Sequence, residues 1–334
     1  MSGDDTGYSA SQNPPSPYGG STGNYSQSQP TNGPYSGSSP PAPGGSSAPA
    51  SVDRAQAVVE ATARINSFKA STFAGKWNAT LDRKSVADRL LELANNPDLV
   101  NQGGDGLCGE AAFFNIWLWD DPLAVSQYAM QLYNGGAAAI GTQEWVRPRP
   151  ELMAQDFSKV AQMFVDGNSD YKKEDVAKWG ADWMMMSALR DANNWIISYD
   201  GTPTDEWGAG SSDGEVARWL RATNHFAAVG VKTGGDEEHN YNHASKLQPG
   251  SDIILISCES HMLGNRMKTK KPEDDHWFVL RSAIIETNGT VDFRFWCWGE
   301  PQQWVNDRRQ SLGLPPLQKQ QFTDEYFGYL IGNR

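Results

Sequence analysis

Cys108 is the residue of this chain best placed to act as a nucleophile. It follows the glycine-rich segment 103–106 and precedes the apolar stretch 111–119. A helix that begins between them places the thiol at the positive end of the helix dipole, which stabilises the thiolate and lowers the thiol pKa. The glycines let backbone amides approach a developing oxyanion, and the side-chain amide of Gln102 can donate to it as well. The segment therefore predicts a thiol nucleophile together with its oxyanion donors.

His276 is the predicted base for this nucleophile. It begins the apolar stretch 276–280, which predicts a strand. A neutral imidazole at this point can accept the thiol proton or pair with the thiolate. The other histidines lie in a polar loop or beside predicted strands, at His225, His239, His243 and His261. We therefore expect Cys108 and His276 to form a catalytic pair.

The residue that orients His276 stays open between two carboxylates, Glu300 and Asp292. If residues 288–289 form a two-residue turn, residues 287 and 290 face each other, and His276 then faces residue 300 or 301. Asp292 has a suitable separation by counting along the chain, but this register places it roughly 25 to 30 Å along the hairpin from His276. The register favours Glu300, and Asp292 is the alternative.

The elements that must position these residues change type along the chain. Helical spacing and cap residues predict helices over residues 54–66, from residue 85 onward, and over 122–133, 183–193 and 215–223. Residues 226–231, 252–258, 276–285 and 291–298 predict strands, the last two joined by the turn at 288–289. Helices first and antiparallel strands later predict an α+β fold, in one domain that covers residues 52–334.

Two segments of the chain resemble the papain-like cysteine peptidase superfamily. Gln102, five intervening residues and then Cys108-Gly109 have the spacing found in papain-like enzymes, and residues 105–111 (DGLCGEA) are similar to bacteriocin-processing double-glycine peptidases. Residues 276–279 (HWFV) resemble the His-Trp-Val-Val strand of the latter. The ending 296–301 (WCWGEP) is similar to the Asn-Ser-Trp-Gly and Asp-Pro endings of these families, with a Trp where papain-like enzymes carry Asn.

The resemblance implies a thiol-dependent hydrolase of papain-like fold, acting on an amide or peptide bond of a protein or peptide substrate. Cys108 would attack, His276 would transfer the proton, and Gln102 would bind the oxyanion. Trp298 and Trp304 are the expected walls of the substrate groove. A deamidase or acyl transferase would use the same residues, and the Trp at position 296 keeps a catalytically inactive binding or scaffold protein as an alternative.

Composition excludes several other functions. Three dispersed cysteines argue against a disulfide framework, and Cys258 and Cys297 have no helix-start setting, so we expect them in the core. No Cys-x-x-Cys or His-Glu-x-x-His spacing occurs, and no metal or other cofactor is expected. A formal net charge of -12 disfavours nucleic acid and anionic membrane surfaces as partners. No segment approaches the ~18 apolar residues of a membrane span.

Residues 1–51 form a distinct N-terminal segment. They contain no Leu, Ile, Val, Phe, Trp, Lys or Arg, so they cannot bury enough apolar area to offset their conformational entropy. A disordered leader is predicted, with no secretory signal peptide. The leader is similar to type III secretion signals, which implies a bacterial effector or toxin that engages a secretion apparatus or chaperone. Such a protein would stay in the bacterial cytoplasm before export into a host cell.

Overall fold

The computed structural model describes most of the chain beyond the predicted leader. The described residues are 53–103, 106–142, 144–168, 171–194, 199–205, 210–226, 228–233, 241–242, 244–250, 252–264 and 275–333. They all fall within one compact unit, Ser47–Arg334. The predicted leader, His239 and His243 lie outside the described residues.

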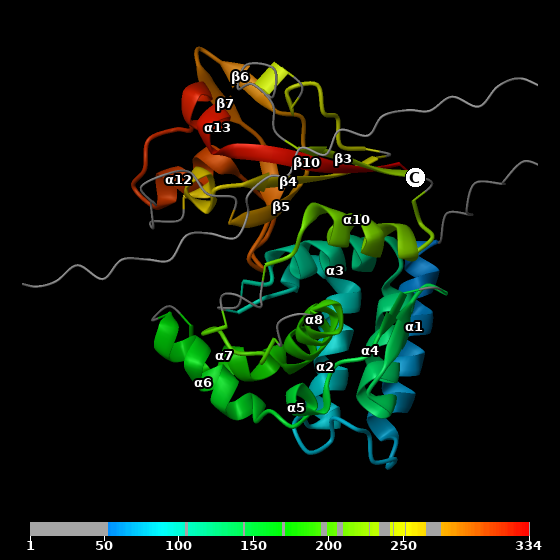
Figure 1. Ribbon diagram of the computed structural model, residues 1–334. Helices are drawn as coiled ribbons and strands as arrows, with labels where there is room; N and C mark the ends of the chain where they lie inside the picture. The colour runs from blue at the N-terminus through cyan, green and yellow to red at the C-terminus, as the bar shows by residue number, and fades with distance from the viewer. Residues whose placement is uncertain are drawn as a thin grey trace, which may run out of the picture. The chain divides into compact units, whose positions relative to one another are not determined.

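Helices make up most of the first half of this unit. The longer ones are α1 (Arg54–Ala70), α2 (Arg83–Asn95), α3 (Cys108–Asp120), α4 (Pro122–Gly135), α6 (Phe157–Gly167), α8 (Gly180–Asn193) and α10 (Asp213–Ala222). Two short helices, α5 (Pro150–Met153) and α7 (Lys173–Val176), and a small hairpin of β1 (Ala138–Ile140) and β2 (Glu144–Val146) connect them. Figure 1 shows α3 and α10 between the sheet and the other helices.

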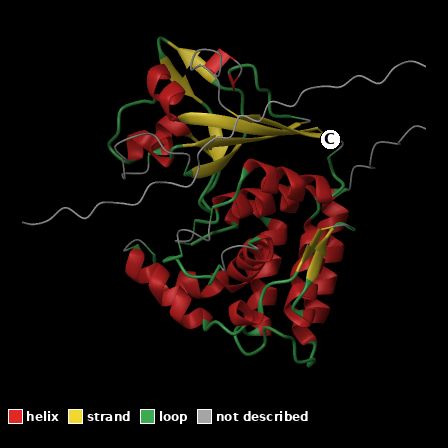
Figure 2. Cartoon of the chain, viewed as in Figure 1, coloured by secondary structure: helices red, strands yellow, loops and turns green. Residues whose placement is uncertain are grey.

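An antiparallel sheet occupies the second half. Its six strands lie in the order β3 (Ala228–Thr233), β10 (Tyr326–Asn333), β4 (Asp252–Cys258), β5 (His276–Leu280), β8 (Arg294–Trp296) and β9 (Gln303–Trp304). A separate hairpin joins β6 (Ile285–Thr287) to β7 (Thr290–Asp292), and two helices follow, α12 (Val305–Ser311) and α13 (Lys319–Glu325). The separation of helices from strands in Figure 2 confirms the predicted α+β class.

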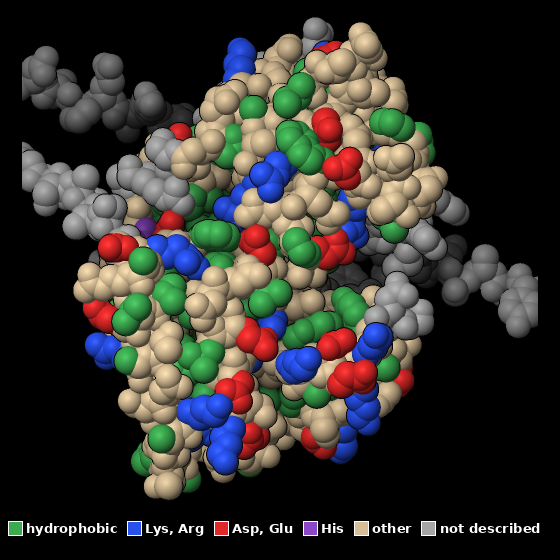
Figure 3. Space-filling view, turned by 180° about the vertical axis from the view of Figure 1, so that it is seen from behind, with side chains coloured by type: hydrophobic (Ala, Val, Ile, Leu, Met, Phe, Trp, Pro, Cys, Tyr) green, Lys and Arg blue, Asp and Glu red, His purple; other side chains and the backbone are tan. Residues whose placement is uncertain are grey.

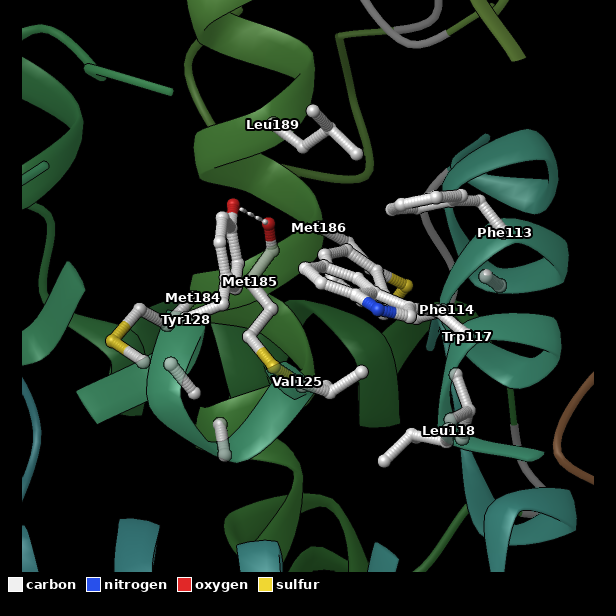
Figure 4. Close-up of a cluster of buried hydrophobic side chains, with 14 of the residues drawn as sticks. Phe113, Phe114, Trp117, Leu118, Val125, Tyr128, Met184, Met185, Met186 and Leu189 are labelled. Atoms are coloured by element: carbon white, nitrogen blue, oxygen red, sulfur yellow. Dashed lines mark hydrogen bonds between the residues drawn. The ribbon is translucent and has the colours of Figure 1, made fainter. Parts of the chain in front are cut away.

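The helical core forms around α3, which is buried along almost its whole length. Phe113, Phe114 and Trp117 pack with Tyr128 of α4, and Figure 4 shows these rings beside the three methionines 184–186 of α8. The Tyr128 hydroxyl donates to the Met185 carbonyl at 3.5 Å. Because each fully buried side chain of this size stabilises the fold by about 1.5–3 kcal/mol, α3 is held rigidly where it meets the sheet.

Strand β5 is covered on both faces, and its side chains alternate between two cores. Trp277 and Val279 join the helical core, which also contains Cys108. Phe278 and Leu280 join a second core on the other face, together with Cys258 and Cys297. The prediction that these two cysteines are buried in the core is confirmed. Strand β5, whose first residue is His276, therefore lies between the two cores.

The surface of the described residues gives less indication of function than the core does. No helix within the described residues is long and apolar enough to cross a membrane. Figure 3 shows Lys and Arg side chains interspersed with Asp and Glu on the face seen from behind. The described side chains of that face form no large region of a single sign.

Candidate active site

Cys108 is the first residue of α3, as the glycine-rich approach predicts. Leu107 precedes it as the N-cap and caps the helix without a side-chain hydrogen bond. At the start of the helix, the Ala111 N–H donates to the Leu107 carbonyl at 2.9 Å. The thiol is only 8% exposed and packs in the helical core. Its Sγ lies 3.9 Å from the carbonyl oxygen of Asp275, to which it donates.

Two opposing effects act on the Cys108 thiol. Burial raises its pKa to about 12, and the nearby carboxylates of Glu110 and Asp275 add to this rise. The backbone N–H groups of Trp277 and Gly109 lower it, because they donate to the sulfur. In this closed environment the thiol is protonated at neutral pH, so attack on a substrate requires a base.

His276 begins β5 and lies opposite Cys258 of β4. Its ring stacks on the Trp298 indole, with ring centroids 4.3 Å apart and planes at 22°. The residue is 4% exposed, and its buried Nε2 has no hydrogen-bond partner among the described residues. Burial lowers the His276 pKa to about 3, and the positive charge of Arg308 lowers it further. The imidazole is therefore neutral at neutral pH, but in this buried position it is a weak base, since an effective general base has a pKa near the working pH.

The structure brings Cys108 to the backbone of His276 rather than to its ring. The sulfur contacts the carbonyl of Asp275 and the N–H of Trp277, the two neighbours of His276 in sequence. Side chains alternate along a strand, so the His276 ring shares a face with Phe278 while Cys108 packs on the face of Trp277. Nε2 can therefore take the thiol proton only if the start of β5 rearranges, because a rotation of the side chain alone leaves the ring on the other face of the strand.

The predicted register at His276 is wrong by about two residues. The turn itself is as expected, because Thr287 faces Thr290 and Ile285 faces Asp292. Further along, however, Val279 faces Trp296, so the pairing has slipped by two residues. The irregular residues 281–284 cause the shift, and β8 ends at Trp296 before any residue pairs with His276 on this side. The residues of the turn determine the register of the β6–β7 hairpin, but they do not determine the register of the β5–β8 pair beyond it.

Neither predicted carboxylate orients His276 through the hydrogen bonds of the described residues. Glu300 instead pairs with Arg308 and accepts from the side chain of Gln303. Asp292 accepts from the backbone N–H groups of Phe293 and Asn306, at 3.1 and 3.3 Å. The contact recorded for the His276 ring is instead the stack of the Trp298 indole on its face.

The two predicted groove tryptophans lie at different places. Trp298 covers His276, as described above. Trp304 instead lines a pocket of about 350 Å³ together with Asp292, Asn306 and Asp307, and this lining includes neither member of the predicted catalytic pair. Only Trp298 can therefore wall a groove that leads to His276.

The segment before Cys108 is fastened to the strand end that carries Trp298. The Trp296 indole N–H donates to the Asp98 carbonyl at 2.9 Å. Trp296, which stands where papain-like enzymes carry Asn, therefore has a structural role here. Gly299 has φ +69°, and a Cβ there would lie 2.8 Å from the Val100 carbonyl oxygen. Gln102, half-buried, follows this contact directly. The predicted oxyanion donor thus lies on a segment that packs against the Trp298 turn.

Glu110 is a buried acid that the sequence analysis did not single out. It is fully buried one residue beyond Gly109, and its Oε2 accepts from the Ser211 hydroxyl at 2.6 Å. Its Oε1 has no hydrogen-bond partner, although Arg190 Nη1 lies 3.6 Å away. Burial raises the Glu110 pKa to about 7, and Arg190 opposes this rise. A lone acid within the apolar sequence CGEAAFF was the available indication.

Replacing Glu110 by glutamine should make stability less dependent on pH. The folded-state pKa of about 7 exceeds the ordinary value of 4.5, so the wild-type protein loses stability as the pH rises through that range. Between pH 5 and pH 8 we expect a loss of about 2–3 kcal/mol in unfolding free energy. Urea unfolding across this range should show the loss in the wild type and in the exposed control Glu151→Gln, but not in Glu110→Gln. Parallel curves for all three proteins would contradict the assignment.

Comparisons with protein-family models, curated proteins and solved structures returned no match to this chain. Within the described residues, no group of three or more His, Cys, Asp or Glu side chains is arranged to hold a metal ion. The case for function therefore depends on the chemistry of the Cys108 region.

Proposed function

We propose that this protein is a thiol-dependent hydrolase of papain-like type that acts on an amide or peptide bond. The observation that carries the proposal is the placement of the Cys108 thiol. It lies at the N-terminus of a buried helix, beside the backbone on both sides of His276, with two N–H groups directed at the sulfur. These groups favour the thiolate once a base removes the proton.

The reaction would proceed in two steps through Cys108 and His276. The sulfur attacks the carbonyl carbon as His276 takes the thiol proton, and the same proton then passes to the leaving amine as the carbon–nitrogen bond breaks. Water, deprotonated by His276, attacks the resulting thioester, and the proton returns to the sulfur as it leaves. Backbone N–H groups at the helix start and Gln102 would stabilise the oxyanion.

The site needs no orienting carboxylate for this chemistry. The buried imidazole is already neutral, and its Nε2 lacks a partner. Stacking on Trp298 holds the ring plane instead. The absence of a hydrogen bond between Glu300 and His276 therefore leaves the Cys108 and His276 roles intact.

The proposal predicts that Cys108→Ala abolishes turnover while the fold survives. We suggest a tryptic digest of casein as the probe, incubated with the full-length chain in the presence and absence of glycinamide and followed by mass spectrometry. Cleavage, side-chain deamidation and amide transfer to glycinamide give different mass changes, so one experiment separates the three reactions. Cys108→Ala should lose any such change while unfolding free energy shifts by no more than about 1 kcal/mol.

Cys258→Ala is the matched control, since Cys258 is also a buried, unpaired thiol but lies in the second core. It should keep activity. Turnover by Cys108→Ala equal to that of the wild type would overturn the proposal.

A binding or scaffold protein without catalysis is the second candidate. The Cys108 thiol donates to a backbone carbonyl, and the His276 ring packs against Trp298 on the other face of β5. These contacts favour a permanently closed site. An unchanged casein digest with both the wild type and a variant that lacks the Trp298 ring would support this second candidate.

A further inference from the structure

The pocket of about 350 Å³ beside Trp304 is separate from the candidate active site. One face of the β6–β7 hairpin forms part of its lining, because the hairpin residues that line it are two directly opposed pairs, Ile285 with Asp292 and Thr287 with Thr290. Residues of β9 and α12 complete the lining. The pocket is large enough for a small ligand or a side chain, since such sites usually measure about 300–1,000 Å³.

Hydrogen bonds hold this pocket in shape. The Asn306 N–H donates to Asp292 Oδ1 at 3.3 Å, and the Asn306 side-chain amide donates to the Val291 carbonyl at 3.0 Å. The side-chain oxygen of Asn306 accepts from the Leu317 N–H at 2.8 Å. The start of α12 is therefore fastened to β7, and the Asp292 carboxylate has a fixed orientation.

Two carboxylates line the pocket without a cation between them. Asp292 uses Oδ1 for two backbone N–H groups, and its Oδ2 makes no hydrogen bond within the described residues. Asp307 is exposed and forms neither a hydrogen bond nor an ion pair in the same part of the chain. Burial raises the pKa of Asp292, and the negative charge of Asp307 adds to the rise. The two carboxylates are therefore close enough to repel each other, and a bound cation would remove this repulsion.

The basic residues around this pocket do not supply that cation. No described Lys or Arg lines it. Arg308 pairs with Glu300, and Arg309 donates to three backbone carbonyls. Arg294 lies opposite Trp304 in the β8–β9 pair but forms no ion pair within the described residues. The negative charge of the pocket therefore stays available to a ligand.

The apolar part of the lining indicates which kind of cation fits. The Trp304 indole is half-buried and stacks on no other described ring. Ile285 is 48% exposed, one of the few large hydrophobic residues at the described surface. A guanidinium can stack on an indole and donate to carboxylates through its planar fork, while its aliphatic stem covers an exposed apolar side chain. An ammonium has neither the flat face nor the fork.

We propose that this pocket binds an arginine side chain of a polypeptide partner, with Asp292 and Asp307 accepting from its guanidinium and Trp304 stacking on it. The pocket is larger than a guanidinium alone, which favours a whole arginine residue over a small free cation. This inference goes beyond the proposed hydrolase function and does not depend on Cys108.

The first test is a ligand-observed NMR titration of the full-length chain with Nα-acetyl-arginine N-methylamide, which presents one arginine as it occurs within a polypeptide. The citrulline analogue has almost the same shape without the charge and should bind at least about tenfold more weakly. The lysine analogue keeps the charge without the fork and should bind about threefold more weakly. No binding of the arginine analogue, or equal binding of either other analogue, would overturn the proposal.

Substitutions test whether the probe binds in this pocket. Asp307→Asn changes an exposed side chain, so the fold should survive, and it should weaken binding of the arginine analogue about tenfold. Trp304→Ala should weaken it about threefold. Asp324→Asn is the matched control, because Asp324 is an exposed carboxylate of α13 that does not line the pocket. Its affinity should equal that of the wild type. Wild-type affinity in Asp307→Asn, or an equal loss in Asp324→Asn, would mean that the pocket is not the binding site.

Discussion

Replacing Asp182 by alanine is expected to lower the unfolding free energy by about 3–5 kcal/mol. Asp182 is fully buried on α8, and its Oδ2 accepts from Arg89 Nε at 2.7 Å. Its Oδ1 accepts from the backbone N–H of Asn101 at 2.9 Å. Removal of the carboxylate leaves the Arg89 charge buried without this partner. Chemical denaturation of the wild type and the variant measures the loss.

Asp175→Ala is the matched control for Asp182→Ala. Asp175 forms an exposed ion pair with Lys178, three residues away, with both side chains more than half exposed. Such a pair contributes about 0–1 kcal/mol, so this control should change stability little. Similar losses in the two variants would mean that the buried pair is not a main stabilising contact.

The Asp182 substitution should also affect the candidate active site. Asp182 accepts a hydrogen bond from the N–H of Asn101, the residue before Gln102. The same segment packs against Gly299, next to Trp298. A looser segment would displace the predicted oxyanion donor. We therefore expect Asp182→Ala to lose casein turnover at temperatures where it remains folded.

Helices with local end points are the part of the fold that the sequence predicts well. Helix α4 begins at Pro122 with the Asp121 side chain accepting from Ala124 N–H, and it stops at Gly136 with φ +72°. All three features are visible in the sequence and act within a few residues. Helix α2 was predicted to start near residue 85 but begins at Arg83, because Asp82 caps it. A competing cap three residues before Ser85 is enough to move the boundary.

Features that depend on distant partners could not be predicted in this way. Strand β10, Tyr326–Asn333, lies between β3 and β4 and pairs with both, but its sequence alternates poorly because it is mostly buried. The slip between the β6–β7 hairpin and the β5–β8 pair likewise depends on how residues 281–284 pack. Neither is encoded in the spacing of neighbouring residues.

The same distinction between local features and features that depend on distant partners applies to the candidate site. The helix start at Cys108 and the strand start at His276 are local features, and both are confirmed. The face on which the His276 ring lies, its stack on Trp298 and the burial of Glu110 depend on the meeting of α3 with β5. Sequence could therefore predict where Cys108 and His276 lie on their elements, while the contacts around them became visible only in three dimensions.

Acid is expected to destabilise the protein through His276. The folded-state pKa of about 3 is below the ordinary value of 6.5, so the stabilising contribution is complete above pH 6.5 and is lost as the pH falls toward 3. Between pH 7 and pH 4 the unfolding free energy falls by about 3 kcal/mol. The reason is that His276 binds a proton in the unfolded chain but stays unprotonated when buried in the folded protein. Urea unfolding of the wild type and His276→Phe at a series of pH values measures the difference.

Subtracting the two curves isolates the imidazole, since Glu110 and other carboxyl groups titrate in both proteins. Trp298→Ala should fall between them, because water admitted by the missing indole would return the His276 pKa toward its ordinary value. Equal slopes in the wild type and His276→Phe would show that the ring is already hydrated in the folded protein.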